Sequence, residues 1–416
     1  MLNFQDTMSL PKRKVLMMKA KYIRHPIHTL KAAKSLAKAH LTMANLASSG
    51  RRKYKSDPRY DLKNVRDGFA SSLDTRGDDS ELLERICRAY IKTIQSQPPA
   101  SEAYAATNWW EEIRQRSLQP VIRALLSSDV KTLQGMYRNF FRDPCSAGLL
   151  NVPFGMSKAY FGGTIKDIHR RFYLSESLHK LDYWSLKTQS RFSIHDLSGP
   201  GVGNPFGIYL DSILIRAGAP YQHYCAHMID SVLPSSDPVV AEIGGGFGGT
   251  AYYLLRDCAN VAYYNFDVPE SLALSSYYLS KAFPKLQLHL FGEPDAPSAV
   301  SDQAKAFLMP LWELSTSPAA SFDIVFSSHS MSDLSHKALL HYLRIVCRVT
   351  RDFFLYIGNS SAANLINEIV RRDYPSAALA KMSSSGWNDY PHSAKHVDEQ
   401  ECLYRFNVAD LDCAEW

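Results

Sequence analysis

The chain of 416 residues lacks long apolar segments and any clustered set of cysteines. No window approaches the roughly 18 consecutive apolar residues that a membrane-spanning helix needs. The seven cysteines are scattered without a Cys-x-x-Cys pair, so the sequence indicates neither a disulfide framework nor a zinc site. With 45% hydrophobic and 21% charged residues, the composition is typical of a soluble globular protein with one large core or two smaller ones.

Acidic residues are almost missing from residues 1–56, which hold 13 Lys and Arg against the single acid Asp6. The rest of the chain has an excess of acids, so the net charge of +6 comes from this segment. Such a segment can remain a solvated tail, or it can contact an anionic membrane at about 1 kcal/mol per Lys or Arg. Because the body is acidic and has no groove-reading motif, we expect no specific nucleic-acid partner.

Charged residues also occupy the N-terminal positions where a signal peptide would carry its apolar core. We therefore expect a cytoplasmic protein. If the basic segment contacts lipid, the protein would lie at the periphery of the inner membrane.

Residues 57–200 show mainly helical patterns. Ser80 can cap a helix whose apolar residues recur at three- and four-residue steps and which ends before Pro98. Trp109 and Trp110 fall in another expected helix, where core packing and ligand contact are both open interpretations. We expect residues 57–200 to form a helical cap over a cofactor-binding domain of residues 201–416.

From residue 239 onward, strand and helix patterns alternate, which predicts an α/β fold with a Rossmann-like, doubly wound, mostly parallel sheet. Residues 402–406 are the candidate for an antiparallel last strand. Residues 292–321 contain four prolines and are expected to form a long connection near the active site. The expected strands are 239–243, 261–266, 286–291, 322–327 and 353–357, and the expected helices are 270–283 and 337–349.

A glycine-rich turn follows the first of these strands and leads into a helix, an arrangement that commonly binds a nucleotide-type cofactor. Its glycines fit the dinucleotide fingerprint, and Asp267 ends the next strand, where a ribose-binding acid is expected. However, Glu242 precedes the turn in the order Glu-x-Gly-x-Gly-x-Gly. A carboxylate there would repel a pyrophosphate and would attract the cationic amino acid end of S-adenosyl-L-methionine. The expected cofactor-binding residues are Glu242, Gly244, Gly245, Gly246, Gly248, Asp267 and Val268.

The segments around this turn resemble the sugar O-methyltransferase family of bacterial polysaccharide pathways. The resemblance is collinear, covers residues 109–404 unevenly and is strongest over residues 203–279. It implies a class I S-adenosylmethionine-dependent methyltransferase fold and a sugar or glycan acceptor. Ser330 to Leu334 resembles the family's Ser-x-x-Glu-Met segment with Asp333 in place of Glu. The other similar segments are residues 203–207, 221–226, 242–249, 267–270 and 276–279.

Methyl transfer to a hydroxyl requires an aligned acceptor and a group that takes its proton. In open parallel sheets such groups gather at the carboxyl ends of strands, and the strand at 322–327 is followed by His329 and Asp333. We expect His329 to be the base because imidazole titrates near neutral pH, while Asp333 either orients it or binds a sugar hydroxyl. His223 is the second candidate base. No tight acidic cluster predicts a metal ion.

The sequence therefore predicts an O-methyltransferase that uses S-adenosyl-L-methionine and acts on a sugar or glycan in bacterial polysaccharide biosynthesis. Two alternatives remain open at this stage. One is an NAD(P)-dependent oxidoreductase acting on a sugar nucleotide, and the other is a noncatalytic scaffold of a polysaccharide-assembly complex.

Overall fold

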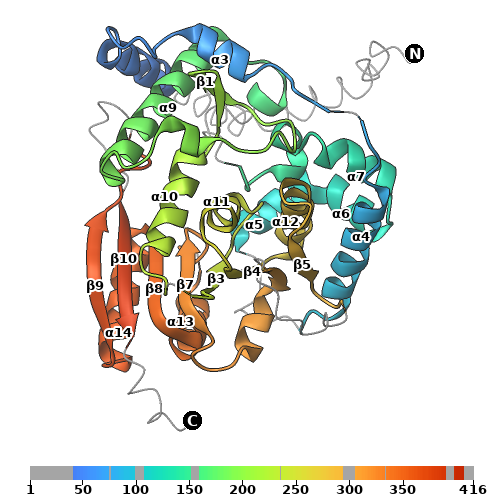
Figure 1. The fold of residues 1–416 in the computed structure, drawn as a ribbon, viewed down its shortest axis with the longest axis vertical. Coiled ribbons are helices and arrows are strands. Elements are labelled where there is room, and N and C mark those ends of the chain that lie inside the picture. Colours follow the sequence, from blue (N-terminus) through green and yellow to red (C-terminus); the bar gives the residue numbers. More distant parts are fainter. Residues whose placement is uncertain are drawn as a thin grey trace, which may run out of the picture.

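A computed structural model describes residues 41–406 with the exception of 75, 99–106, 151–158, 235, 294–304, 333 and 390–397. Its centre is an eight-stranded sheet with the strand order β5-β6-β4-β3-β7-β8-β10-β9 (Figure 1). The strands are β3 (Val239–Ile243), β4 (Ala262–Asp267), β5 (Gln287–Leu290), β6 (Lys305–Pro310), β7 (Phe322–Ser328), β8 (Thr350–Asn359), β9 (Ala377–Ser384) and β10 (Glu399–Phe406).

The direction of the strands confirms the expected Rossmann-like arrangement. Every pair from β5 to β8 is parallel, whereas β10 runs antiparallel to both of its neighbours. The chain builds outward from β3 in one direction through β4 and then returns to place β7 on the other side of β3. The strand order therefore reverses at β3, and ligands of open α/β sheets bind at the carboxyl ends of strands at such a reversal.

The third parallel strand differs from expectation. The segment predicted for that position, residues 286–291, does form β5, but β5 lies at the edge of the sheet. The strand paired with β4 is β6, which falls inside the connection expected over residues 292–321. Alternate residues of β6 are buried, so its pattern is that of a strand. The surrounding prolines led to the wrong prediction of a loop.

Each face of the sheet is covered by its own helices, because alternate strand residues point to opposite sides. Val240 and Phe326 belong to a core shared with α10 (Ala219–Asp230), α11 (Gly249–Asp257) and α12 (Pro269–Ala282). Ala241 and Val325 belong to a second core shared with α13 (His336–Val349) and α14 (Ser360–Asp373). This double coverage explains the nearly continuous apolar character of the central strands.

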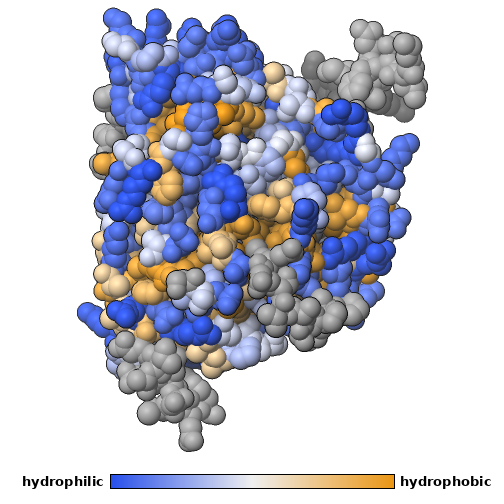
Figure 2. All heavy atoms as spheres, viewed as in Figure 1, coloured by the Kyte–Doolittle hydropathy of each residue, from blue (hydrophilic) through white to orange (hydrophobic). Residues whose placement is uncertain are grey.

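The helical region joins the first of these cores and does not form a separate one. Phe140 lies 5.8 Å from Phe247 and 6.0 Å from Tyr278, measured between ring centroids. The region contains α3 (Leu62–Gly68), α4 (Ser80–Gln95), α5 (Asn108–Ile113), the π-helical turn Arg114–Leu118, α6 (Gln119–Leu126), α7 (Val130–Tyr137), the short 3₁₀ turns Phe140–Arg142, Pro144–Ser146 and Ile194–Leu197, α9 (Asp167–Lys187) and the hairpin β1 (Gly207–Leu210) with β2 (Ile213–Arg216). On the face of the molecule shown in Figure 2, apolar residues form a band across the middle, from α11 towards α4.

The boundary expected at residue 56 is wrong. Residues 41–53 are helical, and Met43, Ala47 and Tyr54 are buried in the same core as the helical region. Tyr54 also donates a hydrogen bond to Asp182 on α9 at 3.1 Å. The prediction of a tail rested only on the charge of this segment and therefore missed its packing. Residues 1–40 lie outside the described part of the chain. Within that part, no helix is both long and apolar enough to cross a bilayer.

Candidate active site

A cavity of about 520 Å³ opens at the carboxyl ends of β3, β4 and β7. Its volume lies within the roughly 300–1,000 Å³ range of ligand-binding pockets. Two groups of residues line it. The first group, called the turn side below, contains Glu242, Gly244, Gly245, Gly246, Thr250, Asp267 and Val268. The second group, called the histidine side, contains Lys180, Tyr221, His329, Trp387, Asn388 and Glu399.

The turn side brings together the predicted cofactor-binding residues except Gly248, which caps α11 and does not line the cavity. Gly244 adopts a φ of +79°, which favours glycine. A Cβ at this position would also lie 2.4 Å from the Cβ of Ser330. Gly244 therefore allows the turn and the loop after β7 to touch each other, which places His329 beside the glycine turn.

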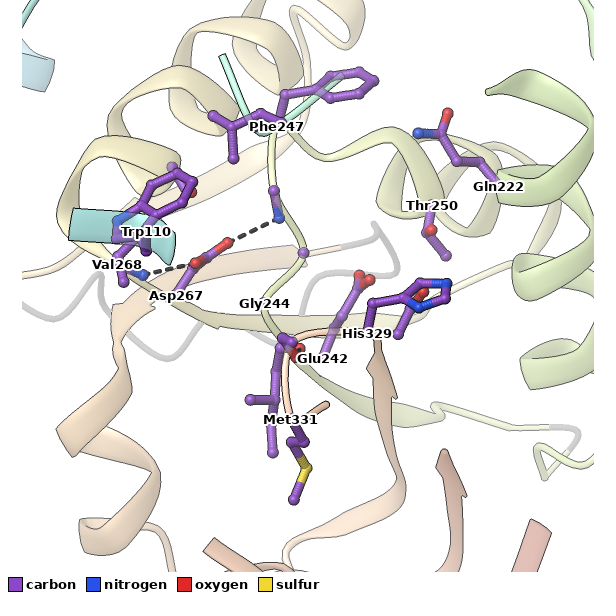
Figure 3. Close-up of a pocket in the computed structure, with 18 of the residues that line it drawn as sticks. Trp110, Gln222, Glu242, Gly244, Phe247, Thr250, Asp267, Val268, His329 and Met331 are labelled. Atoms are coloured by element: carbon purple, nitrogen blue, oxygen red, sulfur yellow. Dashed lines mark hydrogen bonds between the residues drawn. The ribbon is translucent and has the colours of Figure 1, made fainter. Parts of the chain in front are cut away.

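Glu242 lies at the floor of the cavity (Figure 3). Its side chain is buried and accepts a hydrogen bond from the hydroxyl of Tyr263 on β4. Burial raises the pKa of the Glu242 carboxyl to about 7, because desolvation disfavours the charged form. A cationic group bound beside it would favour ionisation, so this acid is suited to a positively charged ligand.

Asp267 ties the end of β4 to the glycine turn. One oxygen accepts a hydrogen bond from the amide of Gly246 at 2.8 Å, and the other accepts one from the amide of Val268 at 2.7 Å (Figure 3). Burial raises the pKa of the Asp267 carboxyl to about 7 as well. Each carboxylate oxygen can accept a second hydrogen bond, so Asp267 can bind ribose hydroxyls while it holds the turn.

His329 follows β7 and lines the cavity, as predicted. Its backbone amide donates a hydrogen bond to the carbonyl of Ile357 at 2.7 Å, and its φ is +63°. A left-handed conformation is strained for a histidine and needs support from the surrounding structure. The Nδ1 atom lies 3.9 Å from a carboxylate oxygen of Glu399. The imidazole of His329 therefore lies beside a carboxylate at the wall of the cavity.

Glu399 is a candidate functional residue that the sequence did not reveal. It is buried, and both of its oxygens accept hydrogen bonds from the amide of Asn388 at 2.8 and 3.1 Å. Glu399 is the first residue of β10 and pairs with Asn359, the last residue of β8. Because β10 is antiparallel, its first residue lies at the edge where the parallel strands end. No sequence motif marks a residue in that position.

The histidine side also has aromatic walls. The rings of Tyr221 and Trp387 meet edge to face at 5.2 Å, and the Tyr221 hydroxyl is 2.6 Å from the Ser328 hydroxyl. Trp109 and Trp110 line the cavity too, and Trp109 is 54% exposed. The two tryptophans therefore differ. Trp109 is exposed at the cavity, where it can contact a ligand, whereas Trp110 is buried and packs in the core.

The structure does not bring the second predicted base, His223, to this site. His223 is buried on α10, accepts a hydrogen bond from the indole of Trp184 at 3.2 Å and is not among the residues that line the cavity. Burial lowers the pKa of His223 to about 4, so it is neutral at physiological pH and packs between aromatic rings. Asp333 lies outside the described residues.

Among the described residues, no group of three or more His, Cys, Asp or Glu side chains is arranged to hold a metal ion. Glu293, which could serve as a metal ligand only if the fold brought it to Asp267, forms an ion pair with Arg85 at 2.6 Å.

The sequence matches no protein-family model and no curated protein. Solved structures give weak matches. A TehB-like SAM-dependent methyltransferase from Corynebacterium glutamicum is 14% identical and covers 55% of this chain and 99% of its own, with a TM-score of 0.31. M. capricolum TrmK, solved with S-adenosyl-homocysteine, is 13% identical over 44% of this chain and 68% of its own, with a TM-score of 0.30. The [4+2]-cyclase SpnF is 11% identical over 46% of this chain and 83% of its own, with a TM-score of 0.33. Because these matches are weak, the assignment of a Rossmann-like fold rests on the strand order and strand directions of the sheet.

Proposed function

We propose that the protein is an S-adenosyl-L-methionine-dependent O-methyltransferase whose acceptor is a hydroxyl of a sugar or glycan. The observation that carries the proposal is the buried carboxyl of Glu242 beside the glycine turn. A dinucleotide would bring its pyrophosphate to this turn, next to a second acid, Asp267. The ammonium group of S-adenosyl-L-methionine instead gains a charge-assisted hydrogen bond there.

The residues present fit this cofactor. Glu242 would hold the amino group of its methionine part, and Asp267 would accept hydrogen bonds from its ribose. The cofactor supplies a methyl group that is already activated by a positively charged sulfur. The protein then has to align the acceptor oxygen with that methyl group and accept the acceptor's proton.

Residues of the histidine side perform both the alignment of the acceptor and the acceptance of its proton. His329 takes the hydroxyl proton as the new oxygen–carbon bond forms, and the nearby Glu399 carboxylate stabilises the resulting imidazolium. The ring of Trp109, which is exposed at the cavity, offers a surface on which the apolar face of a sugar ring can pack. Asn388 and Lys180 add hydrogen-bonding groups at the same wall. The resemblance to enzymes of polysaccharide pathways supports a role in bacterial polysaccharide biosynthesis.

Isothermal titration calorimetry with S-adenosylhomocysteine and with NADPH tests the cofactor. Binding of the first and not of the second is expected, whereas binding of NADPH alone would favour a sugar-nucleotide oxidoreductase. Transfer of a labelled methyl group to a panel of nucleotide sugars and oligosaccharides tests the acceptor. A chain that binds S-adenosylhomocysteine and methylates no member of the panel would contradict the proposed acceptor.

We also propose that the basic start of the chain contacts an anionic membrane, which would place a cytoplasmic enzyme at the periphery of the inner membrane. Residues 1–40 hold nine Lys and Arg and one acid, and the described helix continues this charge with exposed Arg51, Arg52 and Lys53. Sedimentation with anionic vesicles should capture the full chain at low salt and release it at high salt. Equal capture of a chain without residues 1–40 would contradict the proposal.

A further inference from the structure

Arg216 is a buried arginine behind the glycine turn. Its side chain is 2% exposed, and its guanidinium lies 5.5 Å from the ring centroid of Phe141 and 5.1 Å from that of Phe247. It donates hydrogen bonds to the carbonyl of Ala217 at 3.0 Å and to the side chain of Gln222 at 2.7 Å. Among the described residues it forms no ion pair with a carboxylate. Its guanidinium places a positive charge behind the glycine turn.

This arginine fixes the orientation of the Gln222 amide. Because a guanidinium only donates hydrogen bonds, the atom of Gln222 that faces Arg216 must be the oxygen. The amide nitrogen must then point the other way. Figure 3 shows this nitrogen on the side that faces the glycine turn. Gln222 lines the cavity, and its amide nitrogen makes no hydrogen bond to the described residues.

The Gln222 amide lies against the first residue of α11. A Cβ at Gly249 would be only 2.3 Å from the side-chain amide carbon of Gln222. One residue further along, Thr250 is 7% exposed and lines the cavity, and its hydroxyl makes no hydrogen bond within the described part of the chain. Unpaired amide groups and the positive end of the helix dipole are also present at the start of α11.

We propose that Gln222 and Thr250 bind the carboxylate of the amino acid part of the cofactor, and that Arg216 positions Gln222 for this contact. The inference rests on the proposed use of S-adenosyl-L-methionine. Gln222 and Thr250 lie on one side of the glycine turn, and Asp267 and Val268 lie on the other (Figure 3). The two sides match a cofactor whose amino acid end and ribose point in different directions from the turn. The positive charge of Arg216 behind Gln222 adds attraction for an anion, and Glu242 holds the neighbouring ammonium group.

Two ligands distinguish binding at this subsite from binding at the rest of the cofactor site. S-adenosylhomocysteine carries the amino acid part, whereas 5′-methylthioadenosine keeps the adenosine and lacks the amino acid. Calorimetry on Gln222→Met and Thr250→Val, two variants of nearly unchanged size, should show affinity for S-adenosylhomocysteine reduced about tenfold or more. The affinity for 5′-methylthioadenosine should change by less than about twofold, because that ligand does not reach the subsite.

A charge variant and a control complete the test. Gln222→Glu keeps a hydrogen-bond acceptor for Arg216 and places a negative charge beside the ligand carboxylate, so it should reduce S-adenosylhomocysteine binding more than Gln222→Met does. Asp267→Asn should weaken both ligands, because both contain the ribose. Equal weakening of the two ligands by the Gln222 variants, or no weakening of either, would overturn the subsite. Failure of the unmodified protein to bind S-adenosylhomocysteine would instead overturn the proposed function.

Discussion

The turn side and the histidine side of the cavity are assembled in different ways. The turn side comes from one strand–turn–helix unit, β3 to α11, and from the end of the adjacent strand β4. The histidine side takes single residues from α9, α10, the end of β7, the segment after β9 and the start of β10. A contiguous unit preserves its geometry as one piece, whereas a composite wall can change one residue at a time. This difference suits a constant cofactor on the turn side and a variable acceptor on the histidine side.

The largest effect is expected from removal of the base. His329→Ala should lower kcat by about 10²-fold or more, because general base catalysis contributes typically 10²- to 10⁴-fold. Affinity for S-adenosylhomocysteine should stay within about twofold, because the turn side is untouched. Initial rates and calorimetry measure both quantities. His336→Ala, an exposed histidine at the start of α13, is the matched control and should leave kcat unchanged. A loss of less than about threefold in His329→Ala would contradict the assignment.

A substitution on the turn side should produce the opposite pattern. Glu242→Gln keeps the shape of the side chain and removes its charge, so the affinity for S-adenosylhomocysteine should fall by about 1.5–3 kcal/mol, the range for hydrogen bonds to charged groups. At saturating cofactor, kcat should fall much less than in His329→Ala. Unchanged affinity in a folded variant would show that Glu242 does not contact the ligand.

A smaller effect is expected from Glu399, which would act through His329. Glu399→Gln retains an acceptor for Asn388 and should lower kcat by about tenfold with little change in cofactor affinity. The rising limb of the pH–rate profile should move to lower pH, because a carboxylate beside an imidazole favours its protonated form. A purely structural role would change stability and leave the position of this limb unaltered.

A last effect, on stability and not on catalysis, is a pH dependence that originates on the turn side. Burial raises the pKa of both Glu242 and Asp267 to about 7, so between about pH 4 and pH 7 the folded protein binds more protons than the unfolded chain. Their contribution is therefore fully present below about pH 4 and is lost as the pH rises through 7. Urea unfolding of the ligand-free protein should show this fall relative to Glu242→Gln/Asp267→Asn. A constant difference between the two proteins from pH 5 to 8 would contradict the shifts.

The contrast between the two sides also explains what the sequence could reveal. Glu242 and the glycines are adjacent in the chain, and Asp267 ends the very next strand, so a local pattern was sufficient to predict them. His329 was accessible to the same reasoning because it directly follows a parallel strand. Glu399 begins an antiparallel strand, and its position at the site depends on the pairing of β10 with β8. No local pattern encodes that pairing.

The same limit applies to the fold. The alternation of strands and helices predicted the mostly parallel sheet and its antiparallel strand β10. It did not predict which strand pairs with β4, because β6 lies among prolines and the order of strands is set by packing across the whole sheet. The burial of Met43 and Tyr54 was also missed. The hydrogen-bond partner of Tyr54 lies on α9, more than a hundred residues away in the sequence.

The common core of the helical region and the sheet limits how this protein can be re-engineered. Phe140 and Phe141 pack directly on Phe247 of the glycine turn, so the segment before residue 201 helps to shape the cofactor loop. Transplanting that segment onto another Rossmann-like scaffold to transfer acceptor preference would leave aromatic surface exposed on both pieces. New specificity is more accessible through point changes at Trp109 and Asn388, which line the cavity and do not belong to the shared core.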